Sequence, residues 1–233
     1  MSRYRLGHGI VVRRTVLPSG DVVVTVFGPA GKWRGIARKG KKLGGHTSRL
    51  SLFNDVEVQL YARRPDEDLP LITQVVLSGA LPRLADPAVY PYAHVLAELV
   101  DRITSDKSPD GELFELFASG LRGVHQHPNP SHVALLYAWR LLRASGFAPL
   151  VQRGITGPAK LSVPGGALGM DETGVALTTS EAQELAGFII GSMHTALANP
   201  PANLMQHWRW FATYVQYHVH SLNSLQYIVN GGA

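Results

Sequence analysis

The chain is organised around the stretch from Lys32 to Arg49, which reads KWRGIARKGKKLGGHTSR. It holds seven Lys and Arg residues, and no acid occurs between Asp21 and Asp55. Fixed positive charge at this density repels itself unless a polyanion lies opposite it. The glycines allow the backbone to bend and to approach a phosphate closely, because they carry no side chain. A solvated basic loop is the alternative interpretation.

Positive charge is concentrated in the N-terminal part of the protein. Residues 1–82 hold 13 Lys and Arg against 6 Asp and Glu, whereas residues 83–233 hold 9 against 11. The net charge of +5 therefore combines a basic first third (+7) with a slightly acidic remainder (−2). A polyanionic partner is expected to bind to the first third.

The composition of the 233 residues is that of a globular protein, with 45% hydrophobic and 17% charged residues. Cysteine is absent, which excludes disulfides, thiolate metal ligands and a cysteine nucleophile. The N-terminus has only a short apolar run and no cleavage site of a signal peptide. Since no window approaches the ~20 apolar residues that span a bilayer, we expect a soluble, cytoplasmic protein.

The first 82 residues have the pattern of short strands joined by turns. Runs rich in β-branched residues alternate with glycine, proline and aspartate, and the strands are predicted at 9–16, 22–27, 33–39, 52–61 and 71–81. Five short strands in a basic segment predict a small closed Greek-key barrel of the OB type (oligonucleotide/oligosaccharide-binding fold) over residues 1–82. An SH3-like barrel would have the same pattern.

After residue 82 the apolar residues recur at helical spacing. Helices are predicted at 88–104, 113–124, 131–145, 179–198 and 204–222. Residues 151–178 are rich in glycine and proline and predict an irregular insertion with one hairpin. The predicted fold class is therefore α+β with two domains, an OB barrel at 1–82 and a helical bundle at 83–233 that contains the cysteine-free insertion.

The residues that could carry chemistry are few and do not form a catalytic pattern. The HQHPNPSH motif (125–132) offers three histidines at a helix end without an acid or cysteine to complete a metal site. The acidic cluster at 66–68 falls in a predicted turn. No nucleophile elbow, Walker A loop or dinucleotide fingerprint occurs. We therefore expect a protein that is not an enzyme and that uses no catalytic residue, metal or cofactor.

Trp33 is the aromatic residue of most interest, because it lies between Lys32 and Arg34 on one predicted strand. Its ring has two alternative roles, stacking on a nucleobase or packing into the barrel. Binding that depends mainly on backbone charge would be insensitive to sequence and strongly dependent on salt.

Several segments, in this order and spacing, resemble the RecO family of bacterial recombination mediators, most closely those of the Deinococcus and Thermus group. The resemblance extends from Gly9 to Leu150 and rests on GIVVRR (9–14), VVVTVFGPAGKWRGIARKG (22–40), LSGALPRLADPAVYPYAH (77–94), LFASGLRGV (116–124) and ALLYAWRLLRASGFAPL (134–150). Many members carry four zinc-binding cysteines after an LLxxxG motif. The matching stretch here, residues 152–174, has none, so zinc binding is not expected.

The resemblance implies a cytoplasmic, nucleoid-associated protein that acts in RecF-pathway DNA repair and recombination. Its partners would be single- and double-stranded DNA, RecR, the C-terminal tail of the single-strand-binding protein SSB, and RecA indirectly. Its activities would be annealing of complementary strands and, with RecR, help in loading RecA onto SSB-coated DNA. An RNA-binding barrel adaptor, associated with tRNA or the ribosome, is the alternative.

The resemblance also implies which residues bind. Positions that match the family's DNA-binding barrel would neutralise phosphates; they are Arg13, Arg14, Lys32, Arg34, Arg38, Lys39, Lys41 and Lys42, with Arg49, Arg3 and Arg5 as additions and Trp33 beside them. The acidic SSB tail would dock on the helical domain, and Arg122, Arg140 and Arg143 are the candidates for this contact.

Overall fold

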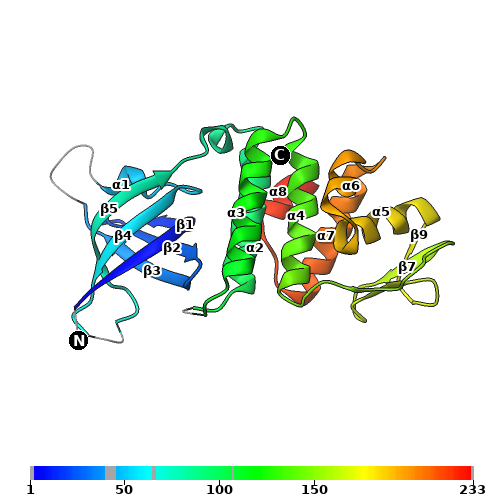
Figure 1. The fold of residues 1–233 in the computed structure, drawn as a ribbon, viewed down its shortest axis with the longest axis horizontal. Coiled ribbons are helices and arrows are strands. Elements are labelled where there is room, and N and C mark those ends of the chain that lie inside the picture. Colours follow the sequence, from blue (N-terminus) through cyan, green and yellow to red (C-terminus); the bar gives the residue numbers. More distant parts are fainter. Residues whose placement is uncertain (1–2, 40–45, 65–66, 107, 232–233) are drawn as a thin grey trace.

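The structure is a computed structural model that describes residues 3–39, 46–64, 67–106 and 108–231. A β-rich part at the N-terminus is followed by helices, with a second small sheet beyond them, so the coarse prediction of strands followed by helices is confirmed. Figure 1 shows the three parts in a row, with the N-terminal strands at one end, helices in the middle and the small sheet at the other end.

The N-terminal strands are β1 (Tyr4–Val16), β2 (Val22–Gly28), β3 (Gly31–Ala37), β4 (Asp55–Tyr61) and β5 (Leu71–Gly79), with a short helix α1 (His46–Arg49) before β4. They pair in the order β1-β2-β3-β5-β4, and β4 pairs back onto β1. The last seam, between β3 and β5, is narrow. It consists of one parallel pair, Ile36 with Leu71, and a hydrogen bond of 3.0 Å from the Ile36 nitrogen to the Pro70 oxygen.

A single long strand, β1, joins the two halves of this barrel. Its first half pairs with β4 and its second half with β2, and the strand bends at Gly9, which has a φ of 151°. A β-carbon at this position would collide with the carbonyl oxygen of Phe27, so the close approach requires glycine. Valines of β2 and β4, with Ile72 and Val75 of β5, fill the interior.

The central helices are α2 (Tyr90–Ile103), α3 (Gly111–Gln126) and α4 (Pro130–Ala144), preceded by a 3-10 turn at Pro82–Ala85. Trp139 of α4 is fully buried, and its ring lies 4.9 Å from that of Phe211. The barrel packs onto these helices through Phe27, whose ring lies 5.9 Å from that of Phe114. Barrel and helices therefore share one apolar cluster, while a second cluster fills the barrel interior.

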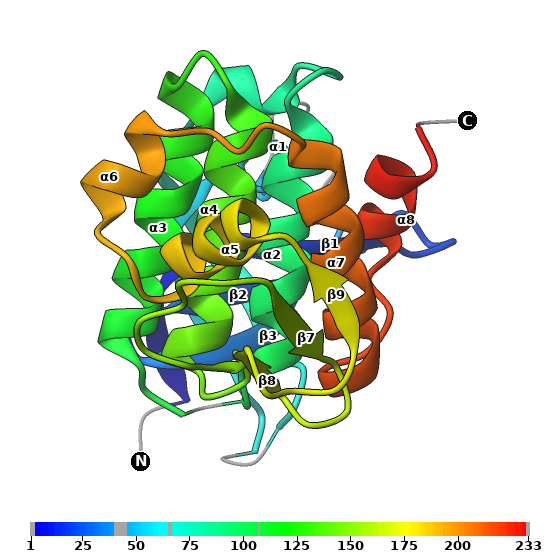
Figure 2. The same cartoon turned by 90° about the vertical axis from the view of Figure 1, so that its right-hand side faces the viewer.

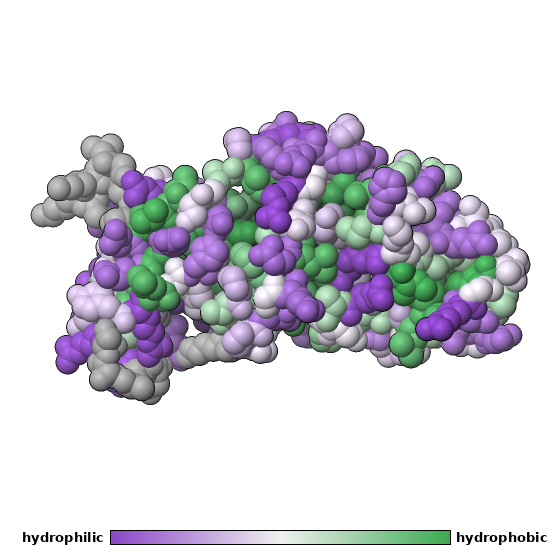
Figure 3. Space-filling view, viewed as in Figure 1, coloured by the Kyte–Doolittle hydropathy of each residue, from purple (hydrophilic) through white to green (hydrophobic). Residues whose placement is uncertain are grey.

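The later helices differ from the sequence prediction in their boundaries. The single helix predicted at 179–198 is two helices, α5 (Thr179–Ile190) and α6 (Met193–Ala198), because the chain turns at Gly191 and Ser192 and the Ser192 side chain caps α6. The last predicted helix, 204–222, ends earlier, as α7 (Leu204–His218), and a further helix that was not predicted follows it, α8 (Asn223–Val229). On the face seen in Figure 3, hydrophobic residues reach the surface in separate places between hydrophilic ones.

The prediction of an irregular insertion at 151–178 is wrong. The segment forms a four-stranded sheet in the order β6-β8-β7-β9, from β6 (Leu150–Val151), β7 (Ala159–Ser162), β8 (Ala167–Gly169) and β9 (Val175–Leu177). The predicted hairpin is the β7–β8 pair. The strands are too short to show an alternating pattern, and the pairing of β6 with β8 joins residues distant in sequence. Figure 2 shows this sheet beside α5.

Candidate nucleic-acid interface

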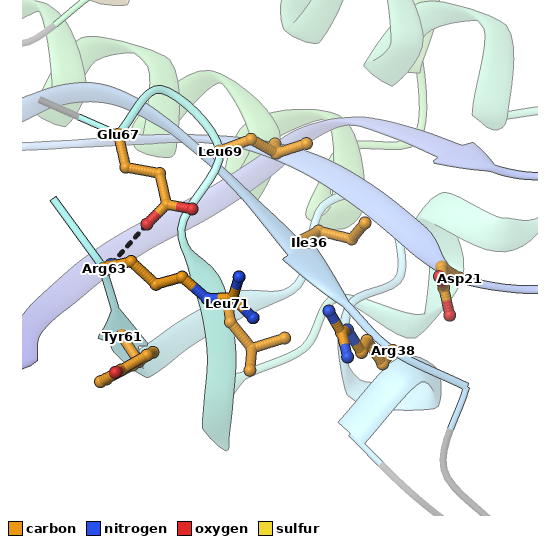
Figure 4. Close-up of a pocket in the computed structure, with 8 residues that line it drawn as sticks. All are labelled: Asp21, Ile36, Arg38, Tyr61, Arg63, Glu67, Leu69 and Leu71. Atoms are coloured by element: carbon orange, nitrogen blue, oxygen red, sulfur yellow. Dashed lines mark hydrogen bonds between the residues drawn. The ribbon is translucent and has the colours of Figure 1, made fainter.

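A groove of about 430 Å³ lies on the outside of the barrel at the β3–β5 seam. Ile36 and Leu71 form its floor, and its walls come from the loop between β1 and β2 and the loop between β4 and β5. We call this site the seam groove; its lining residues are Asp21, Ile36, Arg38, Tyr61, Arg63, Glu67, Leu69 and Leu71. In Figure 4 the side chains of Arg38 and Arg63 extend toward each other from opposite sides of Leu71.

The two arginines in the groove are the groups that could bind a phosphate. Arg38 follows β3 directly, and Arg63 follows β4 after one residue; both are exposed, as is Lys39. Their side chains make no hydrogen bond or ion pair within the described ranges of the chain. Two guanidinium groups facing one another across an apolar floor make a site for an anion that bridges them.

Two carboxylates at the edge of the seam groove fix its loops. Asp21 accepts a hydrogen bond of 2.9 Å from the backbone nitrogen of Lys39, and Glu67 accepts one of 2.6 Å from that of Arg63. The bond from Lys39 is the largest cause that lowers the pKa of Asp21, followed by the bond from Ser19. These carboxylates therefore hold the backbone next to the basic side chains.

The structure brings some of the predicted residues together and separates others. Arg34 lies on the outer surface of β3, exposed, and across the strands it stands in one row with Thr25 and Arg13. Arg13 is also exposed, but its Nε lies 3.3 Å from Oδ2 of Asp101 on α2. Arg34 therefore extends the basic surface, whereas Arg13 is engaged by the helical part.

Lys32 lies at the junction between the barrel and the helices and not in the groove. Only 8% of the residue is exposed, and its Nζ donates to the carbonyl oxygens of Asp101 (2.7 Å) and Thr104 (2.8 Å) at the end of α2. The carboxylates of Asp101 and Asp106 lie 3.3 and 3.7 Å from Nζ. The predicted role of Lys32 in the interface is therefore not supported, because groups at and after the end of α2 neutralise its charge.

Arg14 and Arg49 also lie away from the seam groove. Arg14 lines a second pocket, of about 380 Å³, beside Leu52 and Leu81 at the other side of the barrel. Arg49 donates from Nη1 to the carbonyl oxygen of Val75, at 2.7 Å. The predicted residues Lys41 and Lys42 lie outside the described residues.

Trp33 packs inside the barrel wall and also reaches its surface. Its ring lies against Gly7, where a β-carbon would come within 3.0 Å of it, and against the barrel core. It lines a pocket of about 560 Å³ that is separate from the seam groove. Packing is thus its main role, and the pocket leaves part of the ring accessible.

Two of the arginines predicted to hold an acidic tail have another role. Arg140, 8% exposed, donates from Nη2 to the carbonyl oxygens of Gly187 and Gly191, and Arg143 donates to that of Ile189 at 3.2 Å. These carbonyls belong to the C-terminal end of α5, which favours positive charge. Burial is the main cause that lowers the pKa of Arg140. Arg122 and Arg143 are exposed at the surface, and Arg122 contacts Ser119 and Glu115.

Sequence analysis missed the contribution of the loop between β4 and β5. Arg63, Arg64 and Tyr61 come from a segment that was predicted only as a strand end and a polar turn. Their closeness to Arg38 follows from the β3–β5 pair, which joins residues 35 positions apart. The sequence signal that could have indicated this contribution is the pair Arg63 and Arg64 shortly after a predicted strand.

Within the described ranges, no group of three or more His, Cys, Asp or Glu residues is arranged to hold a metal ion. Of the histidines in the HQHPNPSH motif, His132 is buried against Phe188, and Nδ1 of His127 accepts a hydrogen bond of 3.0 Å from the backbone nitrogen of Asn129. None of the described helices combines the length and the apolar character needed to cross a bilayer.

Comparison with known proteins identifies relatives for most of the chain. The family model of the C-terminal part of recombination protein O matches residues 84–162. The DNA repair protein RecO of Exiguobacterium sibiricum is 28% identical over 195 residues, which is 78% of each chain. The protein of the same name from Bifidobacterium longum is 28% identical over 200 residues, 82% of this chain and 80% of its own. The family match covers the central helices and the first two strands of the small sheet, and the relatives extend the similarity over most of the chain, so the chain is similar to RecO proteins along most of its length.

Proposed function

We propose that the protein is a DNA repair and recombination mediator of the RecF pathway that binds single- and double-stranded DNA through its barrel. The barrel would be of the OB type, which binds oligonucleotides on the face of strands 2 and 3 and at the loops between strands 1 and 2 and strands 4 and 5. The observation that carries the proposal is the seam groove, since these two loops form its walls and Arg38 and Arg63 face each other within it.

The proposed interface differs from the predicted one. It consists of exposed basic residues at and around the seam groove: Arg34, Arg38, Lys39, Arg63 and Arg64, with Arg3 beside Tyr61. Lys41 and Lys42 stay candidates from the sequence alone. Arginine and lysine at these places would neutralise phosphates without reading bases.

The activity proposed for this interface is strand annealing, for which no catalytic residue is needed. Neutralising the phosphates of two strands lowers their mutual repulsion, and base pairing then supplies the free energy. With RecR, the protein would help to load RecA onto DNA coated by SSB. RecR and the SSB tail are proposed as partners from the similarity to RecO proteins. Arg140 and Arg143 do not support a docking place for the tail, because α5 holds both side chains.

The test is a salt titration of single-stranded DNA binding by fluorescence anisotropy. Contact with about five phosphates should give a log–log slope of roughly −3.5. The double variant Arg38→Glu, Arg63→Glu should make the slope shallower by about 1.4 units, because two phosphate contacts are lost. The matched control is Arg209→Glu on α7, an exposed arginine far from the barrel, and it should bind like the wild type.

Two results would contradict the proposal. Weak binding that does not depend on salt would mean that the basic surface has no polyanionic partner. A strong preference for structured RNA over single-stranded DNA would favour the alternative of an RNA-binding adaptor. Annealing assays on free and SSB-coated strands then test the mediator activity, which the double variant should lose.

A further inference from the structure

We propose that the outer face of β1, β4 and β5 binds the bases of the strand whose phosphates lie in the seam groove. The pocket beside Trp33 would hold one unstacked nucleobase at the end of this face. We call the surface the base face; its residues are Tyr4, Leu6, Gln59, Tyr61, Gln74 and Val76. The inference rests on the proposed function and adds to it where the bases of a single strand go.

The base face is continuous with the seam groove. Tyr61 lines the groove, and Gln59, two residues earlier on β4, lines the Trp33 pocket. Residues two apart on a strand lie on the same face. Residues that pair on neighbouring strands also lie on one face of the sheet, and Gln59 pairs with Leu6 of β1 and Gln74 of β5. A strand leaving the groove along β4 therefore arrives at the pocket.

The base face exposes apolar and aromatic side chains to solvent. Leu6 is 87% exposed, Tyr4 53% and Val76 45%. The ring of Tyr4 lies 5.2 Å from that of Tyr61, so an aromatic pair stands between groove and pocket. Exposed aromatic rings beside a basic groove are the stacking platforms on which proteins bind single strands.

The Trp33 pocket has the composition of a site for a nucleobase. Its volume is about 560 Å³, and its lining combines the indole with apolar Leu6, Pro29 and Val76. The indole Nε1 is buried and has no hydrogen-bond partner among the described residues.

Amide side chains give this pocket the polar groups that a base edge requires. Gln74 is exposed, and Gln59 uses only its Oε1, which accepts from the Thr73 hydroxyl at 3.0 Å. The remaining amide groups can donate to and accept from a base.

The charges on the two surfaces separate phosphates from bases. The pocket lining includes the carboxylate of Glu57 and no Lys or Arg among the described residues, and His8 in the lining lies 3.0 Å from the carboxylate of Asp55. A phosphate is therefore disfavoured here and favoured at Arg38 and Arg63. Because a duplex keeps its bases in the stack, only a single strand can use both surfaces at once.

The test compares two oligonucleotides of equal length, one with thymine bases and one abasic, by fluorescence anisotropy. The wild type should bind the thymine strand about tenfold more tightly than the abasic strand. The double variant Tyr4→Ala, Leu6→Ser should bring this ratio close to one and leave the affinity for the abasic strand unchanged. The matched control is Leu150→Ser, an exposed leucine of the small sheet that is 80% accessible, and it should keep the wild-type ratio.

Tryptophan fluorescence gives an independent readout for the pocket. Trp139, Trp208 and Trp210 are buried, so Trp33 is the tryptophan that a strand could contact. Thymine strands should quench the emission of the wild type, and the Trp33→Phe variant, which keeps an aromatic ring in the barrel, should lose this quenching.

The outcomes separate this inference from the proposed function. If both strands bind equally and Arg38→Glu weakens both, the seam groove is the DNA site and the base face is not. A ratio that the double variant does not change also overturns the inference, and would mean that the face serves a protein partner. If neither strand binds, the proposed function itself fails.

Discussion

The two basic sides of the barrel use the same kind of side chain for different purposes. Lys32 at the start of β3 lies on the junction side and Lys39 after its end lies on the groove side, only seven positions apart. Lys32 is nearly buried and binds two carbonyls and two carboxylates, whereas Lys39 is exposed. Lys32 thus joins two parts of the fold, and Lys39 keeps its charge available for a ligand.

The cause of the difference is the end of α2. A helix C-terminus presents unpaired carbonyls and a partial negative charge, and here Asp101 adds a carboxylate that is 9% exposed. A lysine next to these groups donates hydrogen bonds to the carbonyls and forms an ion pair with the carboxylate, so its charge is not available to a ligand. A cluster of basic residues in a sequence can therefore contain both structural and ligand-binding members.

The largest expected effect comes from removing the junction lysine. Lys32→Met should lower the free energy of unfolding by about 3 kcal/mol or more, because Asp101 would lose its buried counter-charge. Urea denaturation measures this. The matched control Lys39→Met should change stability by less than about 0.5 kcal/mol and weaken DNA binding instead. If the folded Lys32→Met protein bound DNA as weakly as Lys39→Met, the comparison would not hold.

A second structural arginine should behave like Lys32. Arg140→Met should cost about 2 kcal/mol of unfolding free energy, because the carbonyls of Gly187 and Gly191 lose a charged donor. DNA affinity should stay at the wild-type value. Arg122→Met, at an exposed position of α3, serves as control and should leave stability unchanged; equal losses in the two variants would argue against the structural role.

The row of Arg13, Thr25 and Arg34 offers the finest comparison, since both arginines are exposed on one surface. Arg34→Gln should weaken single-stranded DNA binding about threefold to tenfold through one lost phosphate contact without a change in stability. Arg13→Gln should lower the unfolding free energy by up to about 1 kcal/mol, because its ion pair with Asp101 is lost. DNA affinity is measured by anisotropy and stability by urea denaturation on both variants. A loss of stability in Arg34→Gln together with a loss of DNA affinity in Arg13→Gln would contradict these roles.

Lowering the pH should distinguish the two regions without any substitution, because it should lower the stability of the helical part and leave the DNA affinity of the groove unchanged. Burial lowers the pKa of His94, His132 and His207, although Glu184 opposes this for His207 and Glu98 does so for His94. As the pH falls below about 6.5, the unfolded chain takes up protons before the folded one, so the stability of the helical part should decrease. The arginines of the groove keep their charge, and DNA affinity per folded molecule should not fall.

The pH dependence can be assigned to a residue by substitution. His207→Gln keeps a donor for Glu184 and should make stability less dependent on pH between 5 and 7. His220→Gln, at an exposed position, should leave the dependence as it is. A wild-type stability that does not change over this range would contradict the assignment.

Local patterns gave much of the fold correctly. The glycine and proline turns and the β-branched runs located all five strands of the barrel, and helical spacing located α2, α3 and α4 within a few residues. Both signals are properties of neighbouring residues. The small sheet was missed, because strands of two to four residues are too short for a pattern and are held by partners elsewhere in the chain.

The sequence alone determined that the N-terminal third is a basic, β-rich unit and that helices follow it. These properties depend on composition and on short-range periodicity, which the chain carries before it folds. Only the tertiary structure decided which basic residues are available to a ligand. The single β3–β5 pair brings Arg38 and Arg63 to one groove, and the docking of α2 buries Lys32. Whether a charge is neutralised depends on contacts between residues far apart in sequence, and no local pattern records them.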